Sequence, residues 1–357
     1  MRINQKTSLF LKIFFPLLAV VAAVHICVFY ALGWHPSGHE EKNAAPPPNA
    51  DLSKLPSERA ATVVPPQIQA PEQPDNSNFF ATHTPAFLPG YDFSRLRSLP
   101  PDLKRLGRTG KSGLIVDLST RRVLWAKNPS TPVPVASLTK LMTALLVMED
   151  ISSGRFSMAT NIPVTSAATS VERSCVLGMK KGEFYPAGEL IAAMMINSHN
   201  DAASQLAAVV AGNVPAFVEQ MNRRASTLGL TSARFNSPNG LPQGKQRLNS
   251  FCSVTDITRL CEYLSRYPEL LEFCRMRSKQ LHTGKVVYSH NNLLRRNPVK
   301  GLFGFKTGYT GKAGFCLAFG VNRNNRRIIG CVTGFPSARD RDNFCRRLID
   351  WAYSTQR

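Results

Sequence analysis

The sequence has few acidic residues and no paired cysteine motif. Its 357 residues include 23 Asp and Glu against 44 Lys and Arg, so the formal net charge is +21. None of the eight cysteines forms a C-x-x-C pair, which argues against a zinc finger or a thioredoxin-type site. No zinc-finger or RNP motif is present either, so we expect no nucleic-acid partner. An anionic membrane surface or an acidic polymer would suit the positive charge equally well.

The cysteines leave two alternatives open. Cys316 and Cys331 could face each other across a predicted hairpin and form a disulfide. Small buried free thiols are the other possibility, and for most of the cysteines the more common one.

The N-terminal segment contains a long uncharged run. Residues 13–32 carry no formal charge apart from a protonated state of His25, and at about 1.5 Å per residue they span about 30 Å, the hydrocarbon thickness of a bilayer. Basic residues precede the run and Glu40 and Glu41 follow it, which places residues 1–12 in the cytoplasm. We therefore expect a single-pass signal anchor, with the rest of the chain outside the cytoplasmic membrane (periplasmic). A cleaved signal peptide is the alternative.

Residues 33–107 predict a linker. The segment 36–107 holds 13 of the 25 prolines, separated by Ala, Gln, Ser and Asn, and cannot build a core. The more apolar residues 79–80 and 87–99 can pack on the domain that follows. We expect this catalytic domain to occupy residues 108–357. Residues 101–357 hold 36 Lys and Arg against 16 Asp and Glu, a net charge of +20.

The order of expected elements indicates an α+β fold. A hairpin is expected at residues 112–126, then helices at 134–150, 187–197, 201–211, 215–228 and from 253 to 267, with an irregular stretch at 161–182. A strand at 303–319, a turn at 322–326, a returning strand at 327–334 and a closing helix at 344–353 follow. Helices inserted between two pieces of sheet predict one antiparallel sheet flanked by helices, with an all-helical half. Clefts commonly form at such a junction.

The predicted helix at 134–150 carries two polar residues at its start. Its long apolar run, on nearly every face, indicates a helix enclosed by the core. Ser137 and Lys140 are three residues apart and share a face. Burial lowers the pKa of a lysine, and a helix N-terminus favours negative charge on the serine. We interpret Ser137 as a nucleophile and Lys140 as the base that activates it.

A Ser-x-x-Lys sequence also occurs by chance about once or twice in a chain of this length, and a solvated lysine on an ordinary helix would explain it. Two further motifs decide between these interpretations: Ser198-His199-Asn200 and Lys306-Thr307-Gly308. Each motif is weak alone. All three in this order, each in a suitable element, are a strong signal.

The three motifs are the S-x-x-K, S-x-N and K-T-G set of penicillin-recognising serine acyl-transferases. Over about residues 111–353 the chain resembles the low-molecular-mass penicillin-binding proteins, the serine-type D-alanyl-D-alanine carboxypeptidases. The matching segments are 136–144, 198–203, 235–241, 304–314 and 341–351. The resemblance implies a β-lactamase/transpeptidase-like fold, hydrolysis of the terminal D-Ala-D-Ala bond of peptidoglycan stem peptides, and covalent inhibition by β-lactam antibiotics. No His, Cys or Asp cluster has metal spacing, so we expect no metal and no cofactor.

The resemblance implies a role for each matching residue in this reaction. Ser137 attacks the carbonyl and becomes acylated, and Lys140 takes its proton. Ser198 relays a proton to the leaving amine. Asn200 holds the substrate amide and orients Lys140. Lys306 adds a positive field that keeps Lys140 neutral and stabilises the oxyanion.

Four further residues are expected to bind the substrate. By similarity, the backbone N–H groups of Ser137 and Tyr309 form the oxyanion hole, and Thr307 and Arg341 grip the terminal carboxylate. Gly308 lets its strand approach the substrate closely.

Simpler explanations exist for several of these residues and their neighbours. Arg341 lies in an Arg-Asp-Arg-Asp run and could be a solvated charge, and Asn200 could cap the helix that follows it. His199 is better explained by packing or solvation than by catalysis. Asn239 stands where related enzymes often have His, and Glu172 has the character of a surface charge on a loop near the cleft.

Three other functions are compatible with parts of this pattern. A D,D-endopeptidase that cuts cross-links would use the same residues. A class A β-lactamase needs an E-x-x-x-N loop, whereas Glu219 and Asn222 have the wrong spacing and lie in a predicted helix. A non-enzymatic wall-binding scaffold would need none of the motif residues. The family often carries a second, all-β domain and a C-terminal anchor, and here we expect the N-terminal anchor and linker in their place.

Overall fold

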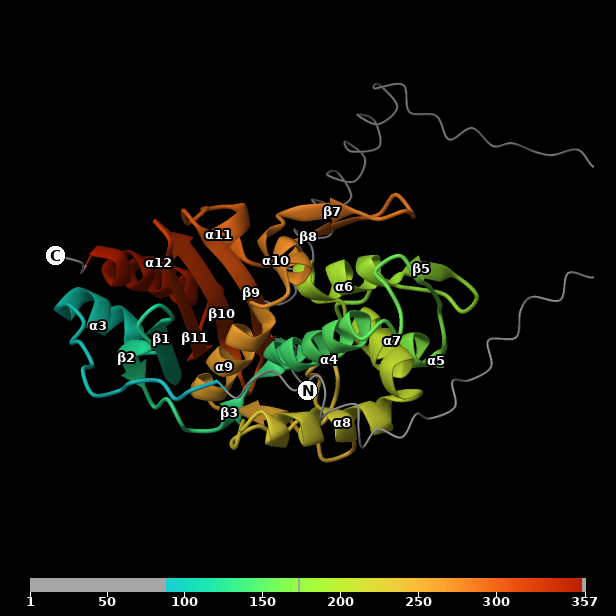
Figure 1. Ribbon diagram of the computed structural model, residues 1–357, viewed down its shortest axis with the longest axis horizontal. Helices are drawn as coiled ribbons and strands as arrows, with labels where there is room; N and C mark the ends of the chain where they lie inside the picture. Colours follow the sequence, from blue (N-terminus) through green and yellow to red (C-terminus); the bar gives the residue numbers. More distant parts are fainter. Residues whose placement is uncertain (1–87, 173, 355–357) are drawn as a thin grey trace, which may run out of the picture. The chain divides into compact units, whose positions relative to one another are not determined.

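A five-stranded antiparallel sheet in the order β2-β1-β11-β10-β9 is the central element of the fold. It belongs to a computed structural model that describes residues 88–172 and 174–354 (Figure 1). The strands are β1 (Ser112–Asp117), β2 (Arg122–Lys127), β9 (Leu302–Thr310), β10 (Gly314–Arg323) and β11 (Arg326–Phe335). β1 pairs with β11, where Ile115 lies opposite Gly330, so segments far apart in the sequence form one sheet.

Both faces of this sheet are covered by helices. Successive residues of β1 alternate between two cores, because Leu114 and Val116 belong to one apolar cluster and Ile115 to the other. α12 (Ala338–Ser354) packs on β10 and β11 from one side together with α3 (Pro101–Gly107), while α9 (Val254–Leu264) contacts β1, β10 and β11. The sheet is therefore the middle layer of three.

The helical half is inserted between β2 and β9 (Figure 1). It is built around the buried α4 (Lys140–Ser152), which contacts α7 and α9. The other helices after β2 are α5 (Ser166–Thr169), α6 (Ala187–Ile196), α7 (Asn200–Ala211), α8 (Val214–Thr227), α10 (Pro268–Arg275) and α11 (Asn292–Arg295). Three short sheets pair β3 (Val133–Pro134) with β6 (Phe251–Cys252), β4 (Asn161–Pro163) with β5 (Phe184–Pro186), and β7 (Ser278–Gln280) with β8 (Val286–Tyr288). The predicted α+β class with an inserted helical half is confirmed.

Most predicted helices agree with the structure to within a few residues. The Ser253 side chain accepts a hydrogen bond from the Asp256 N–H and caps α9, as its sequence predicts. The helix predicted at 134–150 is α4, but it begins only at Lys140 and is preceded by a 3-10 helix, η1 (Ala136–Thr139). The stretch at 161–182, expected to be irregular, contains β4 and α5, and the closing helix begins at Ala338 rather than at 344.

Two predictions about the sheet are wrong. The single strand predicted at 303–319 is two strands, β9 and β10, joined by a turn at Gly311-Lys312-Ala313. Cys316 and Cys331 do not face each other, because Cys316 pairs with Gly308 of β9 and Cys331 with Ala318 of β10. Both are buried free thiols, which is the alternative that the sequence left open.

The predicted linker extends too far towards the domain. The expected packing of the apolar segment before residue 100 is confirmed from Leu88 onwards, where the Asp92 N–H bonds to the Arg121 carbonyl. α3, which lies inside the predicted linker, packs on α12. The predicted membrane segment 13–32 and residues 33–87 lie outside the described residues. Among the residues that are described, no helix combines the length and apolar character needed to cross a membrane.

Candidate active site

Ser137 lies in a turn whose backbone is held from two sides. Ala136, directly before it, has a φ of 47°, a conformation that non-glycine residues adopt at an energetic cost and that clusters at functional sites. Gly240 packs under this turn, and a Cβ at that position would stand 2.0 Å from the Ala136 carbonyl oxygen. Gly308 of β9 packs against η1 as well, since its Cβ would meet the Ser137 nitrogen at 3.3 Å. Two glycines thus fix the position of the serine.

Lys140 is fully buried one turn after Ser137, and its Nζ has three oxygen neighbours. It lies 3.1 Å from Ser137 Oγ, 2.7 Å from Asn200 Oδ1 and 2.6 Å from the Asn239 carbonyl oxygen. The last two can only accept hydrogen bonds. A neutral amine has two protons and one lone pair, so the two carbonyl oxygens use both protons and the lone pair is left for the Ser137 hydroxyl. This is the arrangement of a general base with its nucleophile.

The charge state required for this role follows from the surroundings of Lys140. Complete burial lowers its pKa well below the ordinary value, and the positive charge of Lys306 lowers the pKa further. The sequence-based expectation that Lys306 favours a neutral Lys140 is confirmed in direction. Burial is nevertheless the larger cause.

Asn200 is oriented by the loop that precedes α6. Its Nδ2 donates to the Ser174 carbonyl and its backbone N–H donates to the Cys175 carbonyl, so Oδ1 faces Lys140. Asn200 is the first residue of α7 and its side chain does not cap the helix, which decides against the alternative cap role. Asp201 fixes the same loop, because its carboxylate accepts from the Leu177 and Gly178 N–H groups.

Ser198 and His199 occupy the turn before α7. Ser198 is buried with a φ of 69°, so the second motif includes a residue in a strained backbone conformation, whereas at the first motif the strained residue, Ala136, directly precedes it. Within the described residues its side chain makes no hydrogen bond to Ser137 or Lys140, and its proton-relay role stays a prediction. His199 is buried, and burial lowers its pKa to about 4, so it is neutral and packed, in line with the non-catalytic interpretation.

The third motif forms the opposite wall on β9. Lys306 is 3% exposed and donates to the Thr307 carbonyl oxygen. Burial lowers its pKa to about 8, and the charge of Arg341 also lowers it. Tyr309 is exposed and stacks on Phe315 of β10 with ring centroids 4.2 Å apart. Gly308 permits the close approach of β9 to η1, a contact within the protein, and its approach to substrate stays a prediction.

Arg341 is the predicted site residue whose surroundings differ most from expectation. Its guanidinium was expected to bind the terminal carboxylate of the substrate or to be solvated, but the residue is 3% exposed in the first turn of α12. Nε and one terminal nitrogen donate to Asp342 Oδ1, and the other donates to the Cys316 carbonyl of β10. The guanidinium is thus already engaged inside the protein, and its role in binding a carboxylate stays a prediction.

Sequence reasoning missed the backbone groups of the site. The Asn239 carbonyl oxygen binds Lys140, although only the side chain of Asn239 had been considered. The Ser174 carbonyl, which orients Asn200, was not considered at all. Gly240 lies in the matching segment 235–241, and that resemblance was the signal that could have identified it.

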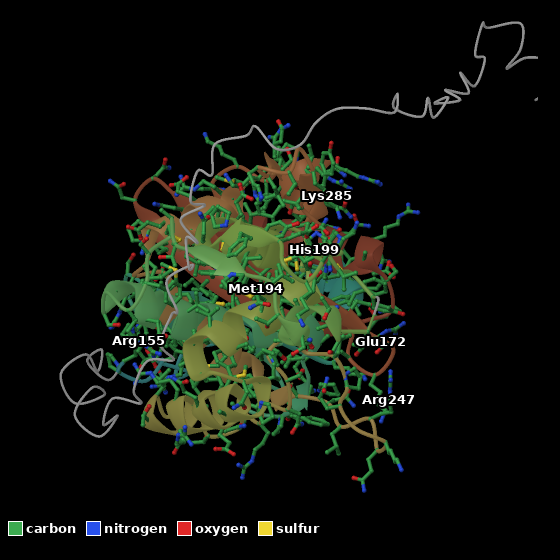
Figure 2. The ribbon with its side chains drawn as sticks, turned by 90° about the vertical axis from the view of Figure 1, so that its right-hand side faces the viewer. Arg155, Glu172, Met194, His199, Arg247 and Lys285 are labelled. Carbon is green, nitrogen blue, oxygen red and sulfur yellow. The ribbon has the colours of Figure 1, made fainter. Side chains whose placement is uncertain are left out.

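Two cavities adjoin these residues. A groove of about 690 Å³ follows the end of β9, lined by Tyr309, Thr310 and Ser174 among others. A second cavity of about 710 Å³ lies between α5, α7 and the loop 237–243. Glu172 lines both cavities, so the surface charge expected near the cleft lies at its wall. Glu172 and Arg247 lie on the same side of the molecule (Figure 2), with 3.9 Å between their nearest charged atoms. Over residues 88–172 and 174–354, no group of three or more His, Cys, Asp or Glu is placed to hold a metal ion.

The pattern of a β-lactamase is not formed by the nearest sequence candidates. Glu219 is exposed on α8 and pairs with Arg223. Asn222 uses its amide to bind the Val218 and Phe235 backbone. Both residues have structural roles in a helix.

Comparison with known proteins agrees with this geometry. A family model described as D-alanyl-D-alanine carboxypeptidase matches residues 104–337. The D-alanyl-D-alanine carboxypeptidase DacF of Bacillus subtilis is 30% identical over 253 residues, which are 70% of this chain and 63% of that protein. A D-alanyl-D-alanine endopeptidase of Pseudomonas aeruginosa is 30% identical over 61% of this chain and 68% of its own length. The chain thus spans somewhat under two thirds of the length of the first of these relatives.

Solved structures share the fold. Penicillin-binding protein 6B of Escherichia coli matches with a TM-score of 0.65 at 28% identity, over 73% of this chain and 81% of that one. Penicillin-binding protein D2 of Listeria monocytogenes, in its ampicillin-bound form, matches with a TM-score of 0.61 at 27% identity, over 68% and 96%. The predicted transpeptidase-like fold is confirmed.

Proposed function

The chain belongs to the D-alanyl-D-alanine carboxypeptidase family of peptidases, and we propose that it removes the terminal D-Ala from peptidoglycan stem peptides through an acyl-enzyme on Ser137. The observation that carries the proposal is the environment of Lys140. Two carbonyl acceptors occupy the protons of a neutral amine, and Ser137 Oγ lies 3.1 Å from the remaining lone pair. Burial and the charge of Lys306 both lower the pKa of Lys140, which favours the neutral amine that this role requires.

Acylation involves two proton transfers, the first to Lys140 and the second from it. Lys140 takes the Ser137 hydroxyl proton while Oγ attacks the carbonyl carbon of the penultimate D-Ala. The oxyanion of the tetrahedral intermediate is stabilised by the Ser137 and Tyr309 N–H groups and by the charge of Lys306. Collapse breaks the peptide bond. The amine of the terminal D-Ala leaves with a proton that passes from Lys140 through Ser198, which leaves Lys140 neutral again.

Deacylation repeats the sequence with water. Lys140 removes a proton from the water that attacks the ester carbonyl, and the Ser137 oxygen leaves and regains a proton. In this scheme a β-lactam acylates the same oxygen by opening its ring, and the tethered leaving group remains in the site. Covalent labelling by penicillin is therefore the direct readout of the first half-reaction.

The test of this function is labelling combined with product release. The wild-type protein is expected to react with a fluorescent penicillin and to release D-Ala from a peptide ending in D-Ala-D-Ala. Ser137→Ala is expected to lose both activities because the ester cannot form. A penicilloyl adduct that mass spectrometry locates on any other residue would overturn the assignment.

A D,D-endopeptidase is the second candidate, favoured by the similarity to the Pseudomonas aeruginosa endopeptidase. The same residues would cut a cross-link in which the amine of a second stem peptide takes the place of the terminal D-Ala. Digestion of purified muropeptides decides between the two. Monomers that lose D-Ala while cross-linked dimers persist support the carboxypeptidase, and dimers converted to monomers support the endopeptidase.

For localisation, we propose that residues 13–32 anchor the protein in the cytoplasmic membrane with the catalytic domain outside. The support is the 20-residue uncharged run between basic residues and Glu40-Glu41 in the sequence. The full chain expressed in bacteria is expected to resist alkaline extraction from membranes, whereas a chain that starts after residue 32 behind a cleavable export signal is extracted. Release of the full chain with a new N-terminus beyond residue 32 would instead identify a cleaved signal peptide.

A further inference from the structure

The loop 174–178, which follows α5, holds Asn200 through two of its carbonyl groups. The Ser174 carbonyl accepts from the Asn200 side chain, and the Cys175 carbonyl accepts from the Asn200 backbone N–H at 2.8 Å. Cys175 has a φ of 51°, a conformation that persists only where the surrounding structure enforces it. Contacts from outside these residues are therefore needed to keep the loop in this shape.

Asp201 supplies two of these contacts at the other end of the loop. It is 2% exposed, and its carboxylate oxygens accept from the Leu177 N–H at 3.0 Å and from the Gly178 N–H at 2.9 Å. Asn200 and Asp201 are consecutive residues at the start of α7, so two adjacent side chains bind two parts of one loop. A shift of the loop away from Asp201 would therefore also move the carbonyl groups that hold Asn200.

A further contact comes from the hairpin of β7 and β8, which packs on α6 (Figure 1). Lys285, directly before β8, donates from its ammonium to the Leu177 carbonyl. Side chains of two different elements thus bind the N–H and the carbonyl of Leu177, whose own side chain is buried. Leu177 is the point at which the loop is fixed most firmly.

The negative charge of Asp201 does not explain its place beside the base. Burial and then the charge of Lys306 lower the pKa of Lys140, whereas the charge of Asp201 raises it. A neutral residue at position 201 would therefore favour the neutral form of Lys140. The carboxylate instead offers two acceptor oxygens to two N–H groups, and an asparagine would turn an N–H₂ donor towards one of them.

We propose that Asp201 is a positioning residue, which acts on Lys140 through the loop 174–178 and Asn200. Without its hydrogen bonds the Asn200 oxygen no longer fixes one proton of the Lys140 amine, so the lone pair is not held towards the nucleophile. The inference rests on the proposed function, because it concerns the base of that reaction.

The test is a double-mutant cycle on the rate of penicillin acylation. Asp201→Asn is expected to lose about tenfold, because small displacements of catalytic groups are costly. In the Asn200→Ala background, where the loop has no side-chain amide to orient, the same substitution should lose less than about twofold, since the two residues act in one chain of contacts. An unchanged or raised rate in Asp201→Asn, or the same loss in both backgrounds, overturns the positioning role.

Asp256→Asn is the matched control. Asp256 is also a buried residue in the first turn of a helix, and its carboxylate accepts from the Ser232 N–H at 2.8 Å. This variant should have a lower melting temperature but the wild-type rate of acylation.

If Asp201→Asn does not fold, Lys285→Met takes its place, because Lys285 is exposed and binds the same loop. It should give a smaller loss that disappears in the Asn200→Ala background, and Lys279→Met on the same hairpin should give none. No loss in Lys285→Met, or an equal loss in both backgrounds, overturns the inference.

A measurement without substrate separates this inference from the function itself. The side-chain amide protons of Asn200, assigned in ¹⁵N spectra by their absence in Asn200→Ala, report its hydrogen bond to the Ser174 carbonyl. They are expected to exchange with solvent faster in Asp201→Asn but not in Asp256→Asn, and equal exchange in Asp201→Asn and the wild type overturns the inference. If penicillin does not acylate the wild-type protein but the exchange depends on Asp201, the positioning contact stands and the proposed hydrolysis fails.

Discussion

The two walls of the cleft each bury one lysine, and the two lysines differ in their surroundings. Lys140, on the helical side, is fully buried among an amide oxygen, a backbone carbonyl and a serine hydroxyl. Lys306, on the sheet side, is 3% exposed and donates to a carbonyl of its own strand. Burial lowers the pKa of Lys306 only to about 8 but lowers that of Lys140 well below its ordinary value. With a pKa of about 8, Lys306 is mostly a cation at neutral pH, whereas burial favours the neutral form of Lys140.

The surroundings of each lysine, and not its residue type, therefore determine whether it acts as the base or as the cation. Two positive charges in one site repel each other. The positive charge of Lys306 therefore favours the neutral form of Lys140. Each lysine thus depends on the other for its state. Variants that change one wall at a time therefore test this dependence.

Removal of the base from the helical wall should have the largest effect. Lys140→Met keeps most of the side-chain volume but lacks the amine, and the rate of penicillin acylation is expected to fall by about 10³-fold, within the range of general base catalysis. The Asn200 and Asn239 oxygens lose their donor, at about 1–3 kcal/mol each, so the melting temperature should fall while the near-ultraviolet circular dichroism stays native. Near-normal labelling would remove Lys140 from the role of base.

Removal of the charge from the sheet wall should change the pH dependence as well as the rate. Without the positive charge of Lys306, protonated Lys140 is less disfavoured, so the pKa of Lys140 rises. In Lys306→Gln the acid limb of the acylation rate is expected to move to higher pH, with a loss of about 10²-fold at neutral pH. Lys306→Arg keeps the charge and serves as the matched control, with its acid limb close to that of the wild type. An unmoved acid limb in Lys306→Gln would mean that the two walls are not coupled.

The role of Arg341, on the sheet side of the cleft, can be tested with two peptides that differ at the C-terminus. If its guanidinium contributes to binding the terminal carboxylate, Arg341→Ala should lose about 1.5–3 kcal/mol on a D-Ala-D-Ala peptide, roughly a ten- to hundredfold loss in kcat/KM, and much less on the C-terminally amidated peptide. The variant also leaves Asp342 without its buried partner, so a lower melting temperature is expected whichever role is correct. Equal losses on both peptides would assign Arg341 a purely structural role.

Gly308→Ala should have the smallest effect, because it alters only how closely the walls approach. The added Cβ would stand 3.0 Å from the Val135 carbonyl and 3.3 Å from the Ser137 nitrogen, so η1 must move by a few tenths of an ångström. We expect a loss of about tenfold in acylation, since small displacements of a nucleophile are costly. Gly311→Ala, where a Cβ meets nothing within 4 Å, is the control on the same hairpin. Equal rates for the two variants would show that the close approach is not required.

The sequence predicted the parts of the site that reside in side chains of short motifs. Ser137, Lys140, Asn200 and Lys306 have the surroundings that their motifs suggested, and the helical half emerges where the apolar patterns placed it. Backbone contributions could not be predicted in this way. The Asn239 and Ser174 carbonyls act through their positions, and any residue type supplies the same oxygen.

The remaining errors have local physical causes. The turn at Gly311-Lys312-Ala313 was overlooked because the apolar residues on both sides predict one continuous strand. A solvated charge was the alternative for Arg341, suggested by the charged run around it, but in the structure its guanidinium is enclosed by Asp342 and β10. The predicted linker was extended to residue 107 because prolines continue up to Pro101. Pro101 is instead the first residue of α3, a position at which helices accept proline.

The proposed mechanism requires a neutral Lys140, and NMR can measure its charge state directly. The ¹³Cε resonance of Lys140, assigned by its absence in Lys140→Met, is to be followed through a pH titration of the protein without substrate. The account predicts the chemical shift of a neutral amine at neutral pH, with the protonated form appearing only on acidification. A resonance that stays that of a charged lysine up to the ordinary pKa of about 10.5 would contradict the account.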